Sequence, residues 1–576
     1  MRWSLLVLAL GGLLPGCLQG SNPPAGGDTP LPLSLAEIQA RLSQPTYDAI
    51  LREEAMVEGT NGTRLGLNIF RPQDATEPVP VILQMSPYAV LAETRSSCTE
   101  LPRGECALAQ DMVDFFVPRG YAVAFADARG HHDSGGCTDH AGPDSWQDGY
   151  DVVEWLAVQP WSNGRVGMYG ASYDADLQVG TAILAPPHLV TIVPTATTSN
   201  LYGFYYYDGI AYQNAPASMA AYAAFSAWPG TRMDPKEYPE RLTCQPEHAQ
   251  TINSPDWNAY WEARDFRPHA SRIQASVLQV HGLQDSTVKP DHVDGFWNNI
   301  TSEKRLILGQ WGHAFPDRPD WPLIRHRWLD HYLKGIDTGI LQDLPSVLIE
   351  DTTGAWRAID SYPPLQAETL KLYLAADGTL SREPPAEGTL TIQDYPRANS
   401  EGYFGQVLSL PGETATGNPR LLAFETEPLD QDLYYTGRPY VHLVASTNAK
   451  STHWVVRLVD ADHEPDDPTA PGEGGIVNYG FLNTRHRLGV KEPRDLTPGE
   501  TYEATVRLYP NDDVFDAGNR IRVVLNNNDP KILQDTTFAT STIYLGPKGT
   551  YFLIPLAPAG APVPEDALRQ DLAQPN

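Results

Sequence analysis

The stretch Arg165-Val-Gly-Met-Tyr-Gly-Ala-Ser172-Tyr173 carries the clearest structural signal in this chain of 576 residues. It opens as an apolar strand and ends in a Gly-x-Ser turn, after which Leu177 to Leu184 can continue as a helix. Small residues beside the serine permit a strained turn that lifts its hydroxyl clear of the sheet, and Asp174 replaces the second glycine usual in this motif. We therefore predict that Ser172 is an exposed nucleophile.

A serine nucleophile needs a base, and the base needs an acid that orients it. Two later strands end near residues of these types: Val277 to His281 is followed by Asp285, and Arg305 to Leu308 is followed by His313. The carboxyl ends of parallel strands meet at one edge of a sheet, where such sites form. The chain order Ser, Asp, His thus predicts a triad of Ser172, Asp285 and His313.

Strand-like and helical periodicities alternate from residue 47 to residue 348 and predict an α/β domain with a mostly parallel sheet. Residues 47–195 and 268–348 are expected to form this domain, and residues 196–267, rich in tyrosine, are expected to form an inserted helical cap. The expected strands are Val79 to Ser86, Tyr121 to Asp127, Arg165 to Tyr169, Val190 to Pro194, Val277 to His281 and Arg305 to Leu308; the expected helices are Asp148 to Val158 and Trp321 to Lys334.

After residue 348 the sequence pattern changes to short β-strand-like segments separated by turn residues. This pattern predicts a β-sandwich over residues 349–556 and a tail over 557–576. The expected strands are Leu370 to Leu374, Tyr440 to Ala445, His453 to Val459, Tyr502 to Tyr509, Arg520 to Leu525 and Ser541 to Leu545.

The composition narrows the class of function. With 41% hydrophobic and 19% charged residues, the chain fits neither a coiled coil nor a disordered protein. A formal net charge of -30 opposes binding to nucleic acid and to anionic membranes. No Cys-x-x-Cys or His-x-x-x-His pattern occurs, so no metal is predicted.

The first residues predict export. Residues 1–17 have the anatomy of a secretory signal, with an apolar stretch after Arg2. Leu14-Pro-Gly-Cys17 is similar to a lipobox, in which Cys17 would be lipidated; the alternative is a soluble secreted protein cut nearby. Residues 18–46 would form a flexible tether and lead-in. Contact with a membrane is expected only through this lipid.

Four further cysteines, Cys98, Cys106, Cys137 and Cys244, would lie in a compartment that permits disulfides. The turn-like sequence between Cys98 and Cys106 favours a local bridge among the three connectivities, which would leave Cys137 to pair with Cys244.

The region around the predicted elbow, Trp161 to Tyr173, resembles the serine hydrolases of the X-Pro dipeptidyl-peptidase and cocaine-esterase family. Asp127-Ala-Arg-Gly130 before it and Gly309-Gln-Trp-Gly-His313 after it strengthen the resemblance, as do Tyr434 to Pro439 and Phe515 to Arg522. The resemblance extends from about residue 47 to residue 556. It implies an α/β-hydrolase domain with a helical cap, followed by a C-terminal jelly-roll β-sandwich.

The same resemblance implies roles for individual residues. Ser172 would be the nucleophile, His313 the base and Asp285 the acid, and no cofactor would be needed. Tyr88 and the backbone N–H of Tyr173 would form the oxyanion hole. Asp127 and Arg129 are expected to form a buried ion pair or to brace a turn.

Two departures bear on the substrate. Family members that hydrolyse α-amino-acid esters carry an acidic pair after the triad aspartate, where this chain has Thr287 and Val288; Asp208 could supply one carboxylate, but structural hydrogen bonding explains it better. The X-Pro dipeptidyl-peptidases also carry an additional N-terminal helical domain, and the segment between the expected leader and Tyr47 is too short for one.

We therefore expect an exported esterase or amidase that acts on small-molecule substrates through an acyl-enzyme. The alternatives are an Xaa-Pro dipeptidyl-peptidase and a non-catalytic lipoprotein that binds carbohydrate or a surface. The sequence predicts no oligomeric state.

Overall fold

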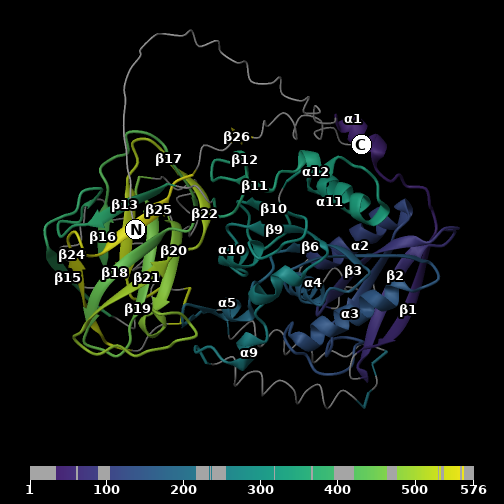
Figure 1. Cartoon of the computed structure of the whole chain (residues 1–576), viewed down its shortest axis with the longest axis horizontal. Coiled ribbons are helices and arrows are strands. Elements are labelled where there is room, and N and C mark those ends of the chain that lie inside the picture. The colour runs from purple at the N-terminus through teal and green to yellow at the C-terminus, as the bar shows by residue number, and fades with distance from the viewer. Residues whose placement is uncertain are drawn as a thin grey trace, which may run out of the picture.

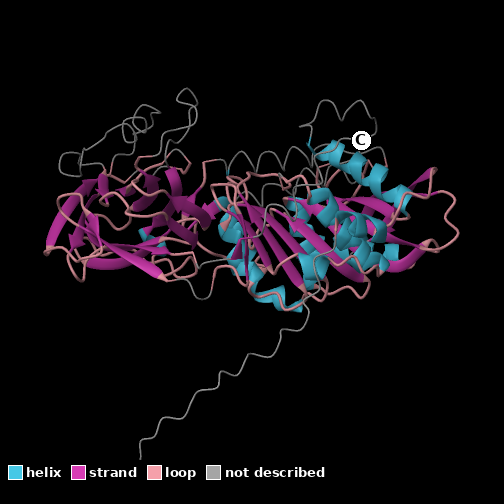
Figure 2. Ribbon diagram, turned by 90° about the horizontal axis from the view of Figure 1, so that it is seen from above, coloured by secondary structure: helices cyan, strands magenta, loops and turns pink. Residues whose placement is uncertain are grey.

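The fold is taken from a computed structural model, which describes residues 34–59, 62–88, 104–213, 215, 232–233, 235–236, 254–316, 318–364, 368–394, 421–462, 476–529, 531–533, 537–557 and 561–562. These residues form two domains that lie side by side, an α/β domain and an all-β domain (Figures 1 and 2). Among the described helices, none is long and apolar enough to cross a membrane.

The α/β domain is built on one large sheet, eleven-stranded in the described residues, with the order β1-β2-β4-β3-β5-β6-β9-β10-β11-β12-β26. Neighbouring strands from β4 to β11 are parallel, and the strands at both edges are antiparallel. The strands are β1 (Ile50–Glu58), β2 (Arg64–Pro72), β3 (Val79–Ser86), β4 (Ala122–Asp127), β5 (Ser162–Ala171), β6 (Leu189–Thr195), β9 (Ser276–Gly282), β10 (Lys304–Gly309), β11 (Val347–Glu350), β12 (Trp356–Ile359) and β26 (Ala561–Pro562). The mostly parallel sheet expected from the sequence is therefore present.

Helices cover both faces of this sheet. They are α2 (Gly104–Phe116), α3 (Pro143–Ala157), α4 (Tyr173–Ile183), α10 (Asp291–Trp297), α11 (Trp321–Leu329) and α12 (Ile340–Asp343), with the short turns η3 (Val117–Arg119), η4 (Arg267–Arg272) and η5 (Asp330–Lys334). The helix expected over Trp321 to Lys334 is α11 continued by the π-helical turn η5, and Gly335 ends it with φ 69°.

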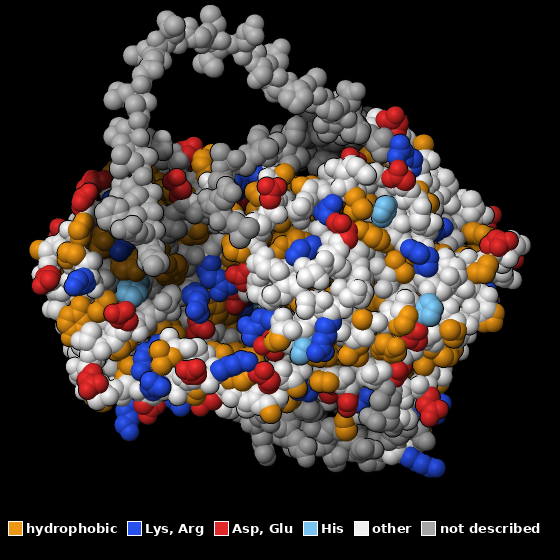
Figure 3. Space-filling view, in the orientation of Figure 1, with side chains coloured by type: hydrophobic (Ala, Val, Ile, Leu, Met, Phe, Trp, Pro, Cys, Tyr) orange, Lys and Arg blue, Asp and Glu red, His pale blue; other side chains and the backbone are white. Residues whose placement is uncertain are grey.

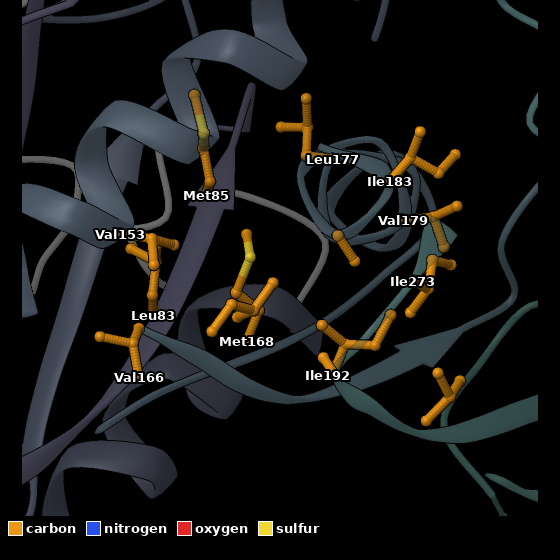
Figure 4. Packing of buried hydrophobic residues seen from close by; sticks show 14 of the residues in the cluster. Leu83, Met85, Val153, Val166, Met168, Leu177, Val179, Ile183, Ile192 and Ile273 are labelled. Carbon is orange, nitrogen blue, oxygen red and sulfur yellow. The ribbon is translucent and has the colours of Figure 1, made fainter. Parts of the chain in front are cut away.

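The period of two along the buried strands explains how one sheet serves two cores. Leu83 and Met85 of β3 pack with α3 and α4, whereas Ile82, between Val81 and Leu83, packs on the opposite face with α2 and α11. Figure 4 shows the first core, where Met168 of β5 lies between β3 residues and the side chains of α4. Parallel strands buried on both faces read as continuous apolar runs, which is why the sequence located them well.

The lead-in departs from the expected flexible tether. Residues 35–41 form helix α1 (Leu35–Arg41), whose first turn is stabilised by a capping box between Ser34 and Glu37. Ile38 is buried, and the backbone N–H of Ser43 donates to Asp330. The apolar spacing within a short, polar helix is too weak a signal to be recognised from sequence.

The expected helical cap is only partly helical where the structure describes it. Helix α5 (Leu201–Tyr205) leads into a small hairpin of β7 (Tyr206–Tyr207) and β8 (Ile210–Ala211), and α9 (Ala259–Glu262) closes the segment. The tyrosines pack in an aromatic cluster with Trp261 and with residues of the all-β domain. Dense aromatic packing thus favours a hairpin at a place where the sequence showed no clear strand period.

The all-β domain is a sandwich of antiparallel sheets, as expected. One sheet has the order β14-β13-β25-β18-β24-β15, with β21 also paired to β18; it packs against the sheet β16-β23-β19-β20, and β17 pairs with β22. The strands are β13 (Thr369–Leu374), β14 (Leu380–Ser381), β15 (Gly388–Gln393), β16 (Leu422–Glu425), β17 (Leu433–Gly437), β18 (Tyr440–Thr447), β19 (His453–Asp460), β20 (Ile476–Asn483), β21 (Thr501–Arg507), β22 (Asn511–Phe515), β23 (Ile521–Asn526), β24 (Thr540–Leu545) and β25 (Tyr551–Pro555), with the turn η6 (Thr484–His486) after β20.

The expected domain boundary at residues 348 and 349 falls inside strand β11. The large sheet continues through β12, which pairs antiparallel with β11, and then takes β26 from the segment expected to be a tail. The sequence misplaced this boundary because antiparallel edge strands of an α/β sheet look like the first strands of a β-sandwich.

Candidate active site

Ser172 lies at the sharp turn between β5 and α4. Its backbone has φ 62° and ψ -128°, a strained conformation for a residue with a side chain. Gly170 has φ 148°, and a Cβ there would lie 2.7 Å from the Cβ of Asp174. The backbone N–H of Ser172 donates to the carbonyl of Thr195 on β6 at 2.9 Å. The predicted nucleophile elbow is therefore formed, and its turn is anchored to the neighbouring strand.

Asp285 sits in the turn after β9 and is almost completely buried. Its Oδ1 accepts hydrogen bonds from the backbone N–H groups of Thr287 (2.8 Å) and Val288 (2.9 Å). Its Oδ2 lies 2.8 Å from Nδ1 of His313. The turn therefore fixes one carboxylate oxygen and directs the other at the imidazole.

His313 follows β10 on a loop that packs closely against the acid turn. The backbone N–H of Gln284 donates to the carbonyl of Trp311 at 3.1 Å, and that of Leu283 donates to Gly309 at 2.7 Å. A Cβ at Gly282 would lie 2.1 Å from the carbonyl oxygen of Trp311, so the close approach of the two segments requires glycine there. The fold thus brings the predicted acid and base together.

A second imidazole lies beside the acid and was not predicted from the sequence. His281, on β9, is fully buried; its Nε2 lies 2.8 Å from the carbonyl of Val288 and 4.0 Å from Oδ2 of Asp285. Burial lowers the pKa of His281, which keeps the ring neutral. A neutral ring that donates from Nε2 holds the turn carrying Asp285 closed.

Tyr88 lies beside the nucleophile, two residues after the end of β3. Its phenol donates to Oγ of Ser172 at 3.3 Å. Tyr173 begins α4, so its backbone N–H lies in the first turn of that helix, next to the serine. Among the hydrogen bonds of the described residues, none joins Ser172 to His313. Such bonds commonly tighten only when substrate binds.

A small pocket lies beside Ser172. The described residues that line it come from the elbow, the loop after β6, helix α5 and the acid turn: His140, Ser172, Tyr173, Asp176, Thr198, Leu201, Phe204, Tyr205 and Val288. Most of these side chains are apolar or aromatic, as is usual for pockets that hold organic ligands. Asp176 is the one carboxylate among these described residues. It was not predicted, although it lies four residues after Ser172.

The Asp-Ala-Arg-Gly segment braces the site through separate partners. Arg129 pairs with Asp148 of α3 at 2.6 Å, and burial raises the pKa of Asp148 to about 6. Asp127 instead lies near His132 (3.2 Å) and Asp133. The expected buried ion pair therefore exists, but Arg129 makes it with helix α3 rather than with Asp127.

One group of described residues offers metal-ligating atoms within 4.8 Å of one another, namely Asp127, His132 and Asp133. The guanidinium of Arg232 lies 2.6 Å from the carboxylate of Asp133. This arginine already supplies the positive charge that a cation would bring.

Asp208 lies at the turn of the cap hairpin, outside the pocket lining. Its carboxylate is 3.5 Å from Arg507 of the all-β domain, and its carbonyl accepts from the N–H of Asn483 at 3.0 Å. Burial raises the pKa of Asp208. Further ion pairs join the domains, Arg485 with Asp256 and Arg438 with Asp294. Basic and acidic side chains meet along this boundary on the face shown in Figure 3.

The remaining predicted sites lie mostly outside the described residues. Cys17, Cys98 and Cys244 are not described, and Cys106 falls in α2, where only the backbone is described. Cys137 is disulfide-bonded. Its pairing with Cys244 and the lipidation of Cys17 stay predictions.

Comparison with known proteins gives the family. The model of the X-Pro dipeptidyl-peptidase (S15 family) matches residues 61–315, and that of the X-Pro dipeptidyl-peptidase C-terminal non-catalytic domain matches residues 338–544. A Streptomyces avermitilis protein, provisionally named Xaa-Pro dipeptidyl-peptidase, is 26% identical over 90% of this chain and 85% of its own. The Xaa-Pro dipeptidyl-peptidase of Lacticaseibacillus paracasei is 25% identical over 72% of this chain and 59% of its own.

Solved structures share the fold. A CocE/NonD family hydrolase from Staphylococcus aureus is similar with a TM-score of 0.71 and 19% identity, over 88% of this chain and 94% of that one. An α-amino acid ester hydrolase is similar with a TM-score of 0.65 and 22% identity, over 93% and 100%. The two matched models follow the two domains in order, and the elbow and the paired Asp285 and His313 lie within the first. The chain belongs to the X-Pro dipeptidyl-peptidase and CocE/NonD family of serine hydrolases.

Proposed function

We propose that this serine hydrolase cleaves carboxylic esters, and amides by the same route, through an acyl-enzyme. The observation that carries the proposal is that one edge of the parallel sheet holds the strained Ser172, with the Tyr88 phenol 3.3 Å from its Oγ, and the Asp285–His313 pair at 2.8 Å.

The reaction begins when His313 accepts the proton of Ser172 while Oγ attacks the substrate carbonyl. Asp285, held by two backbone N–H groups, keeps Nδ1 of His313 protonated and stabilises the imidazolium. The carbonyl oxygen becomes negative and is stabilised by the Tyr88 hydroxyl and the N–H of Tyr173. His313 then protonates the leaving group, and water attacks the acyl-enzyme by the reverse of these steps.

Labelling with a fluorophosphonate tests the nucleophile without assuming a substrate. The wild type should become labelled at Ser172 and should hydrolyse a simple phenyl ester, and Ser172→Ala should do neither. Equal hydrolysis by the wild type and Ser172→Ala would overturn the assignment.

A second candidate activity is the removal of Xaa-Pro dipeptides, favoured by the names of the relatives. The two activities share every triad residue and differ in the need to bind a substrate ammonium. Release of anilide from Gly-Pro-anilide, measured beside hydrolysis of the phenyl ester, separates them: efficient cleavage of the peptide substrate would favour the peptidase. Membership of a serine-hydrolase family argues against the non-catalytic lipoprotein considered from the sequence.

We also propose export with a lipid on Cys17, supported by the apolar leader and the lipobox-like sequence. In detergent partitioning, the wild type should enter the detergent phase and Cys17→Ala the aqueous phase. If Cys17→Ala partitions as the wild type does, the proposal of a lipid anchor is wrong.

A further inference from the structure

Asp174 departs from the usual nucleophile motif, in which a glycine stands two residues after the serine. Its side chain is buried and fills the space that Gly170 leaves open. Oδ2 of Asp174 lies 3.2 Å from the place where a Cβ of residue 170 would be. The carboxylate therefore sits beside the strained turn, where β5 passes into α4.

Gln84 of β3 binds this carboxylate. The side-chain amide of Gln84 donates to Oδ2 of Asp174 at 2.7 Å, and both residues are buried. A buried polar group is costly when its partner is lost, so the hydrogen bond resists displacement of either residue. It ties strand β3 to the first turn of helix α4.

The two residues that this bond joins stand close in sequence to the two proposed oxyanion donors. Asp174 directly follows Tyr173, whose backbone N–H is one donor. Gln84 precedes Tyr88, the other donor, by four residues. The turn between Gln84 and Tyr88 is held because the N–H of Tyr88 donates to Oγ of Ser86 at 3.1 Å. One donor thus follows β3 and the other begins α4, and the bond between Gln84 and Asp174 connects these two elements.

An oxyanion hole works when both donors lie within about 2.7–3.1 Å of the same oxygen, and small errors in their position are costly. We propose that Gln84 and Asp174 are positioning residues, whose hydrogen bond sets the separation between the Tyr88 hydroxyl and the N–H of Tyr173. This inference rests on the proposed function, because it concerns the oxyanion hole of the same reaction.

The alternative role for this bond is a brace of the fold that does not act on the oxyanion hole. A double-mutant cycle of Gln84→Leu and Tyr88→Phe separates the two roles, with kcat and KM for phenyl acetate as the readout. Complete reaction with the fluorophosphonate counts the active sites, so unfolded protein does not enter kcat. In the wild type, Gln84→Leu should lower kcat about tenfold and change KM by less than about twofold. In Tyr88→Phe, where one donor is already missing, it should lower kcat by less than about threefold.

An exchange of the two groups tests the hydrogen bond itself. Gln84→Glu places two carboxyl groups side by side and should lower kcat. Adding Asp174→Asn restores a donor and an acceptor in reversed order, so kcat should return to within about threefold of the wild type. Thr191→Val is the matched control: it removes another buried hydrogen bond, donated by Nε1 of Trp328 at 2.8 Å, and should lower stability without lowering kcat.

The outcomes separate the inference from the function on which it rests. Equal losses of kcat from Gln84→Leu in the wild type and in Tyr88→Phe would show a brace only and overturn the inference, although the hydrolase activity would stand. Absence of recovery in the exchanged pair would overturn it as well, and this pair decides the question if Gln84→Leu does not fold. A normal kcat in Tyr88→Phe would instead contradict the oxyanion hole of the proposed function, and the inference with it.

Discussion

The side-chain amide of Gln310 donates to the backbone carbonyl of Asp512 at 3.0 Å and so joins the loop of His313 to the all-β domain. The same amide donates to the carbonyl of Glu350 at 2.9 Å, and the backbone N–H of Gln310 donates to the Glu350 carboxylate at 2.9 Å. The position of the base thus depends on contacts from both domains. A domain without triad residues helps to orient the triad.

Replacing Gln310 by alanine should lower kcat about tenfold to a hundredfold, because small displacements of a catalytic group are costly. KM should change less, since Gln310 does not line the pocket. Gln284→Ala is the control: this exposed side chain donates to Gln310 at 2.8 Å and, within the described residues, to no other group. An effect on KM alone, or an equal effect of the control, would contradict a positioning role for Gln310.

Tyr88→Phe should remove one of the two oxyanion donors and keep the ring. We expect a loss of about a hundredfold to a thousandfold in kcat, or roughly 3 kcal/mol of transition-state stabilisation. Steady-state kinetics should show kcat and kcat/KM falling together, as for an interaction made only in the transition state. The exposed Tyr434→Phe in the all-β domain should have no such effect; a Tyr88→Phe enzyme with normal kcat would place the oxyanion elsewhere.

Asp285→Asn should keep the fold and lose about ten-thousandfold in turnover, because the amide favours the wrong tautomer of His313 and cannot stabilise the imidazolium. Asp294→Asn is the control, because Asp294 instead lies 3.3 Å from Arg438. Near-normal turnover of Asp285→Asn would show that Asp285 is only a turn residue.

Lys289 should make the stability of the protein depend on alkaline pH. Its ammonium is buried, donates to the carbonyl of Phe204 at 3.4 Å and lies 3.4 Å from the ring centre of Tyr212. Burial lowers the pKa of Lys289 to about 8 from its usual 10.5, so the folded state binds the proton less tightly than the unfolded state.

Below pH 8 the buried ammonium of Lys289 lowers the free energy of unfolding by its full amount. This destabilisation disappears as the pH rises from 8 to 10.5. Relative to Lys289→Met, the wild type should therefore gain about 3 kcal/mol of unfolding free energy across this window. Urea unfolding at several pH values measures the difference, with the exposed Lys450→Met as control. Parallel stability curves for the wild type and Lys289→Met would contradict a lowered pKa.

The strands of the central sheet were predicted well because burial on both faces leaves long apolar runs. Val79 to Ser86 was predicted and observed with the same ends, and Val277 to His281 is β9 with one more residue at each end. The edge strand β1 was not predicted, because Arg52, Glu53 and Glu54 interrupt its apolar pattern. Polar edge strands are common, since charge there discourages pairing with other chains.

The triad residues could be proposed from local patterns because each lies directly after a strand. Asp176 and Gln310 could not be found in this way. Asp176 lines the pocket together with residues of the cap, and the partner of Gln310, Asp512, is distant in sequence. Contacts of that kind are set by the packing of whole domains, which periodicity does not report.

The pairing of β26 with β12 has a consequence for synthesis of the chain. Strand β12 exposes its outer backbone groups when it leaves the ribosome, and its partner is made about 200 residues later, after the whole all-β domain. During that interval the α/β domain carries an open sheet edge, the feature by which nascent proteins associate wrongly. The sheet of the α/β domain can therefore be completed only after the all-β domain has been synthesised.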